Sequence, residues 1–389
     1  MPRRQRGGPD VTLPPFLSAG ADLRLRVMRL HGEPRWWFTA GSSRALDHFL
    51  RSGLGRRWPL QALRARMALP AVGAAWRPDV AAWLRTIGHQ PECALAVQLG
   101  SSGRYRKYVA MGVAGDQRPR WVLKASGTPD SRASIRADAE ALRAVRNAMP
   151  AGVVVPRLFG VTEIGGVVFS LQEACPRPTS GRFHTWSDLH RRFCGSLFAL
   201  PVTDAADWRT AVATREVVRL RIAARGGDAR ALADTCGRLL AFAVGALTGQ
   251  AVRLGWVHRD FTPWNTLKRD NALAVVDWEW ADSAWIPLHD AFHFHLVPAI
   301  HAGADDPELW ERCWGEQSPL TGLASDLGIA GPVAPYGALY LYDTLLFYAD
   351  AIATDPSQQF SDPLLQRLKG LADRWVGRWQ ATALAEARA

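Results

Sequence analysis

The chain has 389 residues, which is enough for two or three domains with buried cores. Hydrophobic residues make up 48% of it and charged residues 21%, and this balance excludes a disordered or fibrous chain. The 47 basic and 36 acidic side chains leave a formal charge of +11. That charge alone would suit a nucleic-acid partner, but no basic-aromatic recognition motif accompanies it, so we expect no nucleic-acid binding.

The cysteines and the apolar runs indicate the cellular compartment of the protein. The five cysteines are scattered and form no Cys-x-x-Cys pair, which argues against a disulfide framework and a structural zinc site. The longest apolar run, residues 239–252, is too short and too interrupted to span a bilayer. We therefore expect a cytoplasmic protein without a signal peptide or membrane span, in which Arg3, Arg4 and Arg6 make at most a weak peripheral membrane contact. The sequence gives no indication of oligomeric state.

Residues 1–92 carry no chemical motif, and we expect them to form an accessory region. The pattern predicts a strand over 23–30 and helices near 42–50 and 79–86.

Residues 93–176 predict a small antiparallel sheet with one helix laid across it. The expected order is β-β-β-α-β-β, and the last two strands flank a Gly165-Gly166 turn. The predicted strands are 93–99, 105–113, 121–125, 153–155 and 167–171, and the predicted helix is 131–148.

Residues 177–389 are predicted to be mostly helical. A long amphipathic helix is expected over 230–254, followed by two short strands at 266–268 and 272–277 and then by further helices. The fold class expected for the whole chain is therefore α+β.

One segment carries recognisable chemistry. Asp260 and Asn265 are separated by four residues in a proline-containing loop, and Asp277 ends an apolar strand shortly after. A carboxylate that accepts a hydroxyl proton, together with an amide and a second carboxylate that hold Mg²⁺, is the minimum set for phosphoryl transfer.

The pattern His258-Arg259-Asp260-x4-Asn265, followed by Asp277-Trp278-Glu279, resembles the aminoglycoside phosphotransferase and choline kinase-like group, which shares its fold with protein kinases. The resemblance covers about residues 93–294. It implies a bilobal, protein kinase-like fold, ATP and Mg²⁺ as cofactors, Asp260 as the catalytic base, and Asn265 and Asp277 as metal ligands. It also implies structural roles for His258, which would brace the loop, and for Asp290, which would buttress the site.

The same template places nucleotide-binding residues upstream. Lys124 lies on the third strand, where a phosphate-binding lysine is expected, and Glu140 lies on the next helix, where its ion-pair partner is expected. The turn formed by Gly100, Ser101, Ser102 and Gly103 stands where the fold covers the phosphates. The segment from Glu173 to Cys175 stands where its backbone would bind the adenine ring.

The acceptor is less well defined than the reaction. Arg259 beside the base would repel a polycation, and Trp264 and Trp280 would stack on a sugar or a quaternary amine. Glu279 is either a further contact for metal or substrate, or a hydrogen-bonding brace. These features favour a small-molecule hydroxyl acceptor, with a sugar or glycan precursor as the leading candidate, over an aminoglycoside.

Two alternative functions remain. The His-Arg-Asp sequence would suit a protein kinase, but no activation segment separates Asp277 from Pro287. A nucleotide-binding scaffold without turnover is the second alternative, and the joint presence of Lys124, Asp260, Asn265 and Asp277 argues against it.

Overall fold

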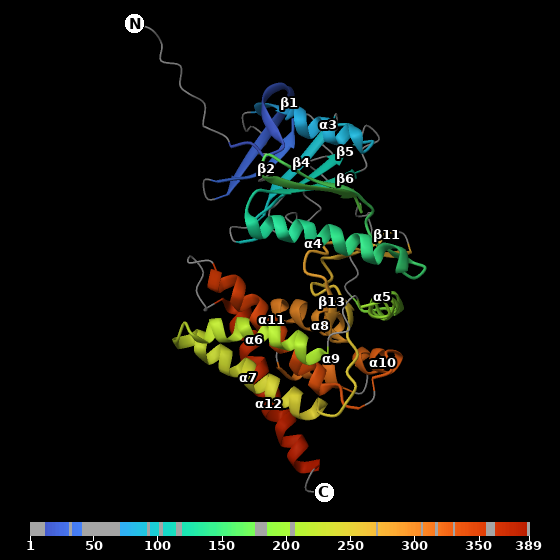
Figure 1. Ribbon diagram of the computed structural model, residues 1–389, viewed down its shortest axis with the longest axis vertical. Helices are drawn as coiled ribbons and strands as arrows, with labels where there is room; N and C mark the ends of the chain where they lie inside the picture. Colours follow the sequence, from blue (N-terminus) through green and yellow to red (C-terminus); the bar gives the residue numbers. More distant parts are fainter. Residues whose placement is uncertain are drawn as a thin grey trace. The chain divides into compact units, whose positions relative to one another are not determined.

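The protein is described from a computed structural model (Figure 1). The structure describes residues 12–30, 33–40, 71–91, 94–100, 104–113, 119–175, 185–202, 207–269, 271–304, 306–315, 318–329, 331–354 and 362–386. Its contacts form two compact units, an N-terminal unit within Met1–Glu140 and Pro156–Arg177 and a C-terminal unit within Ala141–Val155 and Pro178–Ala389. This division differs from the predicted boundaries at residues 92 and 176, because the early strands join the first unit and residues 141–155 join the second.

The N-terminal unit is built on one antiparallel sheet of eight strands (Figure 1). Five of them, in the order β4-β5-β6-β9-β8, form the sheet expected from residues 93–176, and the other three extend it past β4 in the order β3-β1-β2. The strands are β1 (Leu17–Leu30), β2 (Glu33–Thr39), β3 (Ala71–Trp76), β4 (Ala94–Leu99), β5 (Tyr108–Val113), β6 (Pro119–Ser126), β8 (Leu158–Ile164) and β9 (Val167–Glu173).

The sheet curls strongly, so that distant strands touch. Trp76 of β3 and Trp121 of β6 are five places apart in the sheet, which would separate them by about 24 Å in a flat one. Their ring centroids are nevertheless 6.2 Å apart. The first three strands therefore wrap over one face of the other five, and a single hydrophobic core fills the interior, with Phe16, Trp37, Trp121 and Phe169 fully buried in it.

Helix α3 (Pro78–Thr86) adds to the same core. Val80 and Leu84 are completely buried among the inward-facing residues of the sheet, and Trp83 packs against Phe169 of β9. The predicted helix over 79–86 is thus present, whereas the one expected near 42–50 lies outside the described residues. The accessory segment shares its core with the strands that follow it.

The other face of the sheet carries α4 (Pro129–Val145). Because side chains alternate along β6, Trp121 and Leu123 enter the curled core, while Lys124 points to the opposite face and meets α4. The expected five-strand order is present with one correction. The partner of β9 across the Gly165-Gly166 turn is β8, a half-buried strand that was not among the predicted ones.

The predicted strand at 153–155 is the short β7 (Val153–Val154), which pairs with the C-terminal unit. It lies parallel to β12 (Ala272–Val275), which pairs in turn with β11 (Thr266–Arg269). A second small sheet joins β10 (Gly255–Val257) to β13 (Asp282–Trp285). These two sheets hold the segments that contain the predicted catalytic and metal-binding residues.

Helices make up most of the C-terminal unit (Figure 1). Among them, α8 is buried along most of its length and carries both Asp290 and His293. The helices are α5 (Asp188–Phe198), α6 (Trp208–Ala223), α7 (Gly227–Leu247), α8 (His289–Ala302), α9 (Asp306–Trp314), α10 (Pro319–Asp326), α11 (Ala334–Thr354) and α12 (Pro363–Glu386). The long helix predicted to reach residue 254 ends at Leu247, and Gly249 follows with a left-handed φ of 79°.

The α+β class is confirmed by an N-terminal antiparallel sheet and a mostly helical C-terminal region. Among the described residues, no helix is long and apolar enough to cross a membrane.

Candidate active site

The hairpin β11–β12 brings Asn265 and Asp277 to the same end of two paired strands. Thr266 lies opposite Val275, and the Val276 amide donates a hydrogen bond of 3.0 Å to the Asn265 carbonyl. The pairing therefore extends one residue beyond the strands, and Asp277 follows directly. Asp277 has a left-handed φ of 69°, which turns the chain at this point.

Asn265 clasps Asp260 within the loop that precedes the hairpin. The Asn265 Nδ2 group donates to the Asp260 carboxylate oxygen Oδ2 at 2.7 Å and to the Asp260 carbonyl at 2.9 Å. Because the amide nitrogen is used in this way, the side-chain carbonyl oxygen of Asn265 is the atom left to bind a cation. The two hydrogen bonds thus join the ends of the loop across the four residues that separate Asp260 from Asn265.

Asp290 fixes the backbone of the same loop from α8. Its two carboxylate oxygens accept hydrogen bonds of 2.8 Å from the amides of His258 and Arg259. Burial alone would raise the pKa of Asp290. The hydrogen bond and charge of the His289 ring, the His258 ring and the His258 amide together lower this pKa below its usual value. The carboxylate is therefore charged at neutral pH and holds two amides of the loop; its role in a catalytic site stays a prediction.

His258 is completely buried and joins the loop to the strand before Asp277. Burial lowers its pKa, so the ring is neutral. Its Nδ1 accepts from the Asp260 amide at 3.3 Å, which requires the proton on Nε2, and Nε2 lies 3.1 Å from the Val276 carbonyl. One tautomer satisfies both contacts, and the bracing role of His258 in a catalytic site stays a prediction.

Arg259 does not act as the free cation that the sequence suggested. Its backbone is left-handed, with φ of 64°, and its guanidinium turns to the buried carboxylate of Asp343 on α11. Nε and Nη2 donate to Asp343 at 2.9–3.1 Å. The predicted substrate contact is corrected in this respect, because the charge that would repel a polycation is neutralised inside the unit.

Asp343 is the centre of a buried charge cluster. Arg215 of α6 donates to it at 2.5 Å and to Asp282 of β13 at 2.9 Å, and the His289 ring nitrogen lies 3.2 Å away. Burial would raise the pKa of Asp343, but the two arginines and His289 hold it well below its usual value. The cluster connects the loop at Arg259 to three neighbouring elements.

His293 approaches the other oxygen of Asp260. Its Nε2 lies 3.4 Å from Asp260 Oδ1, and its Nδ1 lies 3.4 Å from the Tyr340 hydroxyl. The spacing of Asp290 and His293, three residues apart on one helix, places both on the side that faces the loop.

Three described residues other than glycine have a positive φ: Arg259, Asp277 and Leu288. They lie in the loop, directly after the hairpin and directly before α8. Such conformations are costly and persist where the surroundings enforce them, as at functional sites.

In the N-terminal unit, Lys124 pairs with Asp138 and not with Glu140. Lys124 Nζ lies 2.9 Å from Asp138 Oδ1 in a buried setting, whereas Glu140 is exposed on α4. The predicted partner is corrected because Asp138 shares a helix face with Ile135 and Leu142, three and four residues away, and Glu140 does not.

The other nucleotide-binding predictions are partly outside the described residues. Gly100 is described, but Ser101, Ser102 and Gly103 are not. The amides of Glu173 and Ala174 donate to the carbonyls of Arg157 and Arg120 within the sheet. The roles of Glu173 and Cys175 in binding a nucleotide remain predictions.

The tryptophans near the loop divide into two groups. Trp278 and Trp285 are fully buried core residues, and the Arg215 guanidinium stacks on Trp285 at 3.3 Å from the ring centroid. Trp264 and Trp280, with Glu279, are half-buried. These last three remain the candidates for contact with an acceptor.

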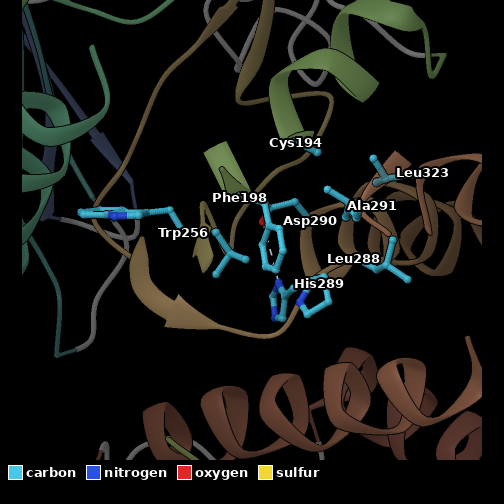
Figure 2. A pocket seen from close by; sticks show the side chains of 11 residues that line it. Cys194, Phe198, Trp256, Leu288, His289, Asp290, Ala291 and Leu323 are labelled. Carbon is cyan, nitrogen blue, oxygen red and sulfur yellow. Dashed lines mark ion pairs between the residues drawn. The ribbon is translucent and has the colours of Figure 1, made fainter. Parts of the chain in front are cut away.

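Figure 2 shows a small cavity beside Asp290 and His289 of α8. Its lining includes Cys194 and Phe198 but none of Asp260, Asn265 and Asp277. It therefore belongs to the supporting structure. Among the described residues, no group of three or more His, Cys, Asp or Glu side chains is placed to hold a metal ion.

Comparison with family models identifies the chain. Residues 101–321, more than half of its length, match the model of the phosphotransferase enzyme family. The chain belongs to this family. The matched span contains Lys124, Asp138 and the whole segment from His258 to His293. No curated protein sequence matches the chain.

Solved structures of aminoglycoside phosphotransferases resemble the family member described here. A thermostable mutant of APH(4)-Ia in its apo form is 15% identical, with a TM-score of 0.47 over 76% of this chain and 97% of that one. APH(2")-IIa in complex with streptomycin and ATP is 14% identical, with a TM-score of 0.48 over 77% and 99%. Likenesses at this level carry no argument about the substrate of the present phosphotransferase.

Proposed function

We propose that this phosphotransferase transfers the γ-phosphoryl group of ATP, with Mg²⁺, to a hydroxyl of a small molecule. The observation that carries the proposal is the set of hydrogen bonds that fixes the loop. Asn265 donates to the Asp260 carboxylate, and Asp290 accepts from the loop backbone. This arrangement fixes a carboxylate beside an amide oxygen, at the end of the hairpin that leads to Asp277. A binding scaffold would need none of this preorganisation.

In the proposed reaction, Asp260 accepts the proton of the acceptor hydroxyl. The hydroxyl oxygen forms a bond to the γ-phosphorus, and the bond between that phosphorus and the leaving ADP oxygen breaks. Lys124, held by Asp138, would bind the nucleotide phosphates. His258 and Asp290 would keep the loop in place without touching substrate.

The donor set fits Mg²⁺. The Asn265 carbonyl oxygen and the Asp277 carboxylate are hard oxygen ligands, and phosphate oxygens and water would complete the coordination. When bound, the metal would neutralise charge on the phosphates as it develops.

A neutral hydroxyl compound, such as a sugar or glycan precursor, is the acceptor that we favour. A polycation would need unpaired carboxylates, yet Asp343 and Asp282 are already engaged by arginines. The half-buried Trp264 and Trp280 offer indole faces on which a sugar ring can stack.

A protein kinase activity is less well supported. Only residues 278–288 lie between Asp277 and α8, and they include β13, which pairs with β10. This leaves no room for the long segment that protein kinases use to bind a peptide.

The test is a screen of sugars, amino alcohols and nucleosides for stimulated ADP release from ATP and Mg²⁺. At least one acceptor should stimulate release, and Asp260→Ala should lower the rate by about a thousandfold or more with little change in ATP affinity. A thermal-shift scan with ATP and Mg²⁺ is the companion measurement. Absence of ADP release together with absence of stabilisation by nucleotide would count against the proposal.

A further inference from the structure

We propose that His293 is a positioning residue that holds the Asp260 carboxylate by donating a hydrogen bond from Nε2 to Oδ1. This inference rests on the proposed function, because it gives His293 a role in orienting the base. It adds a residue on α8 to the loop and hairpin that the sequence identifies.

The two oxygens of Asp260 have separate neighbours. Oδ2 accepts from Asn265 at 2.7 Å, and Oδ1 lies 3.4 Å from His293 Nε2. His293 is 4% exposed, and its Nε2 has no hydrogen-bond partner among the described residues. A buried N–H without a partner is costly, so a small shift that closes this contact is favourable. Contacts of this kind are often long before substrate binds.

Tyr340 contacts the ring nitrogen of His293 that faces away from Asp260. Its hydroxyl lies 3.4 Å from His293 Nδ1. Burial raises the pKa of Tyr340 well above its usual value, so the phenol stays protonated and is able to donate. A ring that carries its proton on Nε2 accepts at Nδ1, so the contact with Tyr340 is compatible with donation from Nε2 to Asp260.

The ring of His293 is held on both sides. It stacks on His289, one turn earlier on α8, at a centroid distance of 6.1 Å and an interplanar angle of 13°, and Tyr340 meets it edge-on at 6.0 Å. Both partners are buried. The donor is therefore preorganised, and α8 fixes the loop backbone through Asp290 and the base through His293.

The chemical consequence concerns rotation of the carboxylate. With Asn265 on one oxygen and His293 on the other, the plane of the Asp260 carboxylate is set before the acceptor arrives. A carboxylate in a fixed orientation does not have to rotate before it accepts the hydroxyl proton. Loss of that orientation therefore slows the chemical step more than it weakens substrate binding.

The experiment compares two amide variants that are both polar. In His293→Gln the amide nitrogen reaches the position of Nε2, whereas in His293→Asn it reaches only that of Nδ1. With ATP, Mg²⁺ and the acceptor mixture described above, we expect His293→Asn to lower kcat for ADP release by about ten- to a hundredfold, with KM for ATP unchanged. We expect His293→Gln to retain kcat to within about threefold of the unaltered protein.

His295→Gln is the matched control, because it alters a histidine on the same helix that has no contact with Asp260. It should leave kcat unchanged. Equal kcat values for His293→Asn and His293→Gln overturn the inference, whether both are high or both are low. If the unaltered protein releases no ADP, the proposed function fails first, so the two failures are distinguishable.

Discussion

Lys124 and Asp138 form a buried ion pair, with 2.9 Å between Nζ and Oδ1 and side-chain exposures of 6% and 0%. The pair joins β6 to α4 and presents the single lysine of its strand on the face of the sheet opposite the curled core. An ion pair at such a depth is costly to break from one side, because the remaining charge has no water to solvate it.

Asp138→Ala should therefore destabilise the N-terminal unit strongly. Loss of one partner of a buried pair costs about 3–5 kcal/mol, which corresponds to a fall in melting temperature on the order of 10 °C for a unit of this size. Scanning calorimetry measures the change. Glu140→Ala, two residues away and exposed, is the matched control and should leave the melting temperature nearly unchanged. Equal effects of the two substitutions would contradict the assignment.

The charge cluster around Asp343 predicts an asymmetry between its members. Asp343→Asn leaves both Arg215 and Arg259 without their shared carboxylate, whereas Arg259→Gln leaves Asp343 paired with Arg215. We expect Asp343→Asn to cost about 3–5 kcal/mol and Arg259→Gln clearly less. Denaturant unfolding of the C-terminal unit, followed by tryptophan fluorescence, compares them. The reverse order would show that Arg259 and not Asp343 is the centre of the cluster.

The proposed metal ligands predict a change in the requirement for Mg²⁺. Asn265→Ala removes a ligand oxygen and the clasp on Asp260, so the Mg²⁺ concentration for half-maximal ADP release should rise by about tenfold or more. Chelation of the metal should stop ADP release from the unaltered protein. Thr262→Ala serves as the comparison, because Thr262 lies in the same loop and its buried hydroxyl has no hydrogen-bond partner among the described residues. An unchanged Mg²⁺ requirement in Asn265→Ala would exclude Asn265 as a ligand.

Two buried histidines near the loop predict acid sensitivity. Burial lowers the pKa of His190 to about 3 and that of His295 to about 4. Because both lie below the unfolded value of about 6.5, the unfolded chain binds more protons between these limits, and stability falls as the pH drops below about 6.5.

Each of these histidines should contribute a loss of about 2 kcal/mol between pH 7 and pH 5. His295→Gln removes one titrating group, so the free energy of unfolding of this variant should change less over that interval. Urea unfolding at the two pH values measures the difference. An identical pH dependence in variant and unaltered protein would mean that His295 is accessible to water and titrates normally.

The curled sheet predicts that the first strands cannot be removed. Phe16, Trp37 and Trp76 belong to the same core as Trp121 and Phe169. A chain that begins at residue 93 would expose that core to water, and we expect it to be insoluble or unfolded. Circular dichroism and size-exclusion chromatography give the answer. A folded truncated protein would show that residues 1–92 are dispensable for the unit.

Much of the site was predictable because its chemistry is local in sequence. Asp260, Asn265 and Asp277 lie within eighteen residues of one another, and the strand pattern between them predicts the hairpin that aligns them. The ion-pair partner of Lys124 could also have been predicted from the sequence. Asp138 lies on the apolar face of α4, three residues after Ile135, and a lone acid on a buried face requires a cation.

Other features depend on contacts between distant segments, which no local pattern records. Arg259 was expected to face the acceptor. Its guanidinium instead donates to the carboxylate of Asp343, which lies 84 residues later in the chain. The only signal was Asp343 itself, one of two aspartates in the otherwise largely apolar sequence of α11. Likewise, the wrapping of β1–β3 over the sheet follows from the twist of many strands, and the contact of Trp76 with Trp121 is its result.

The register of β11 and β12 also determines how this family member can vary in length. Residues added at the tip, between Arg269 and Ala272, lengthen the turn and leave Asn265 and Asp277 at the same end of the ladder. A single residue inserted within either strand would reverse the side on which each following side chain projects. Insertions and deletions between these two residues should therefore be accommodated at the tip alone, and alignments of related sequences can place their gaps there.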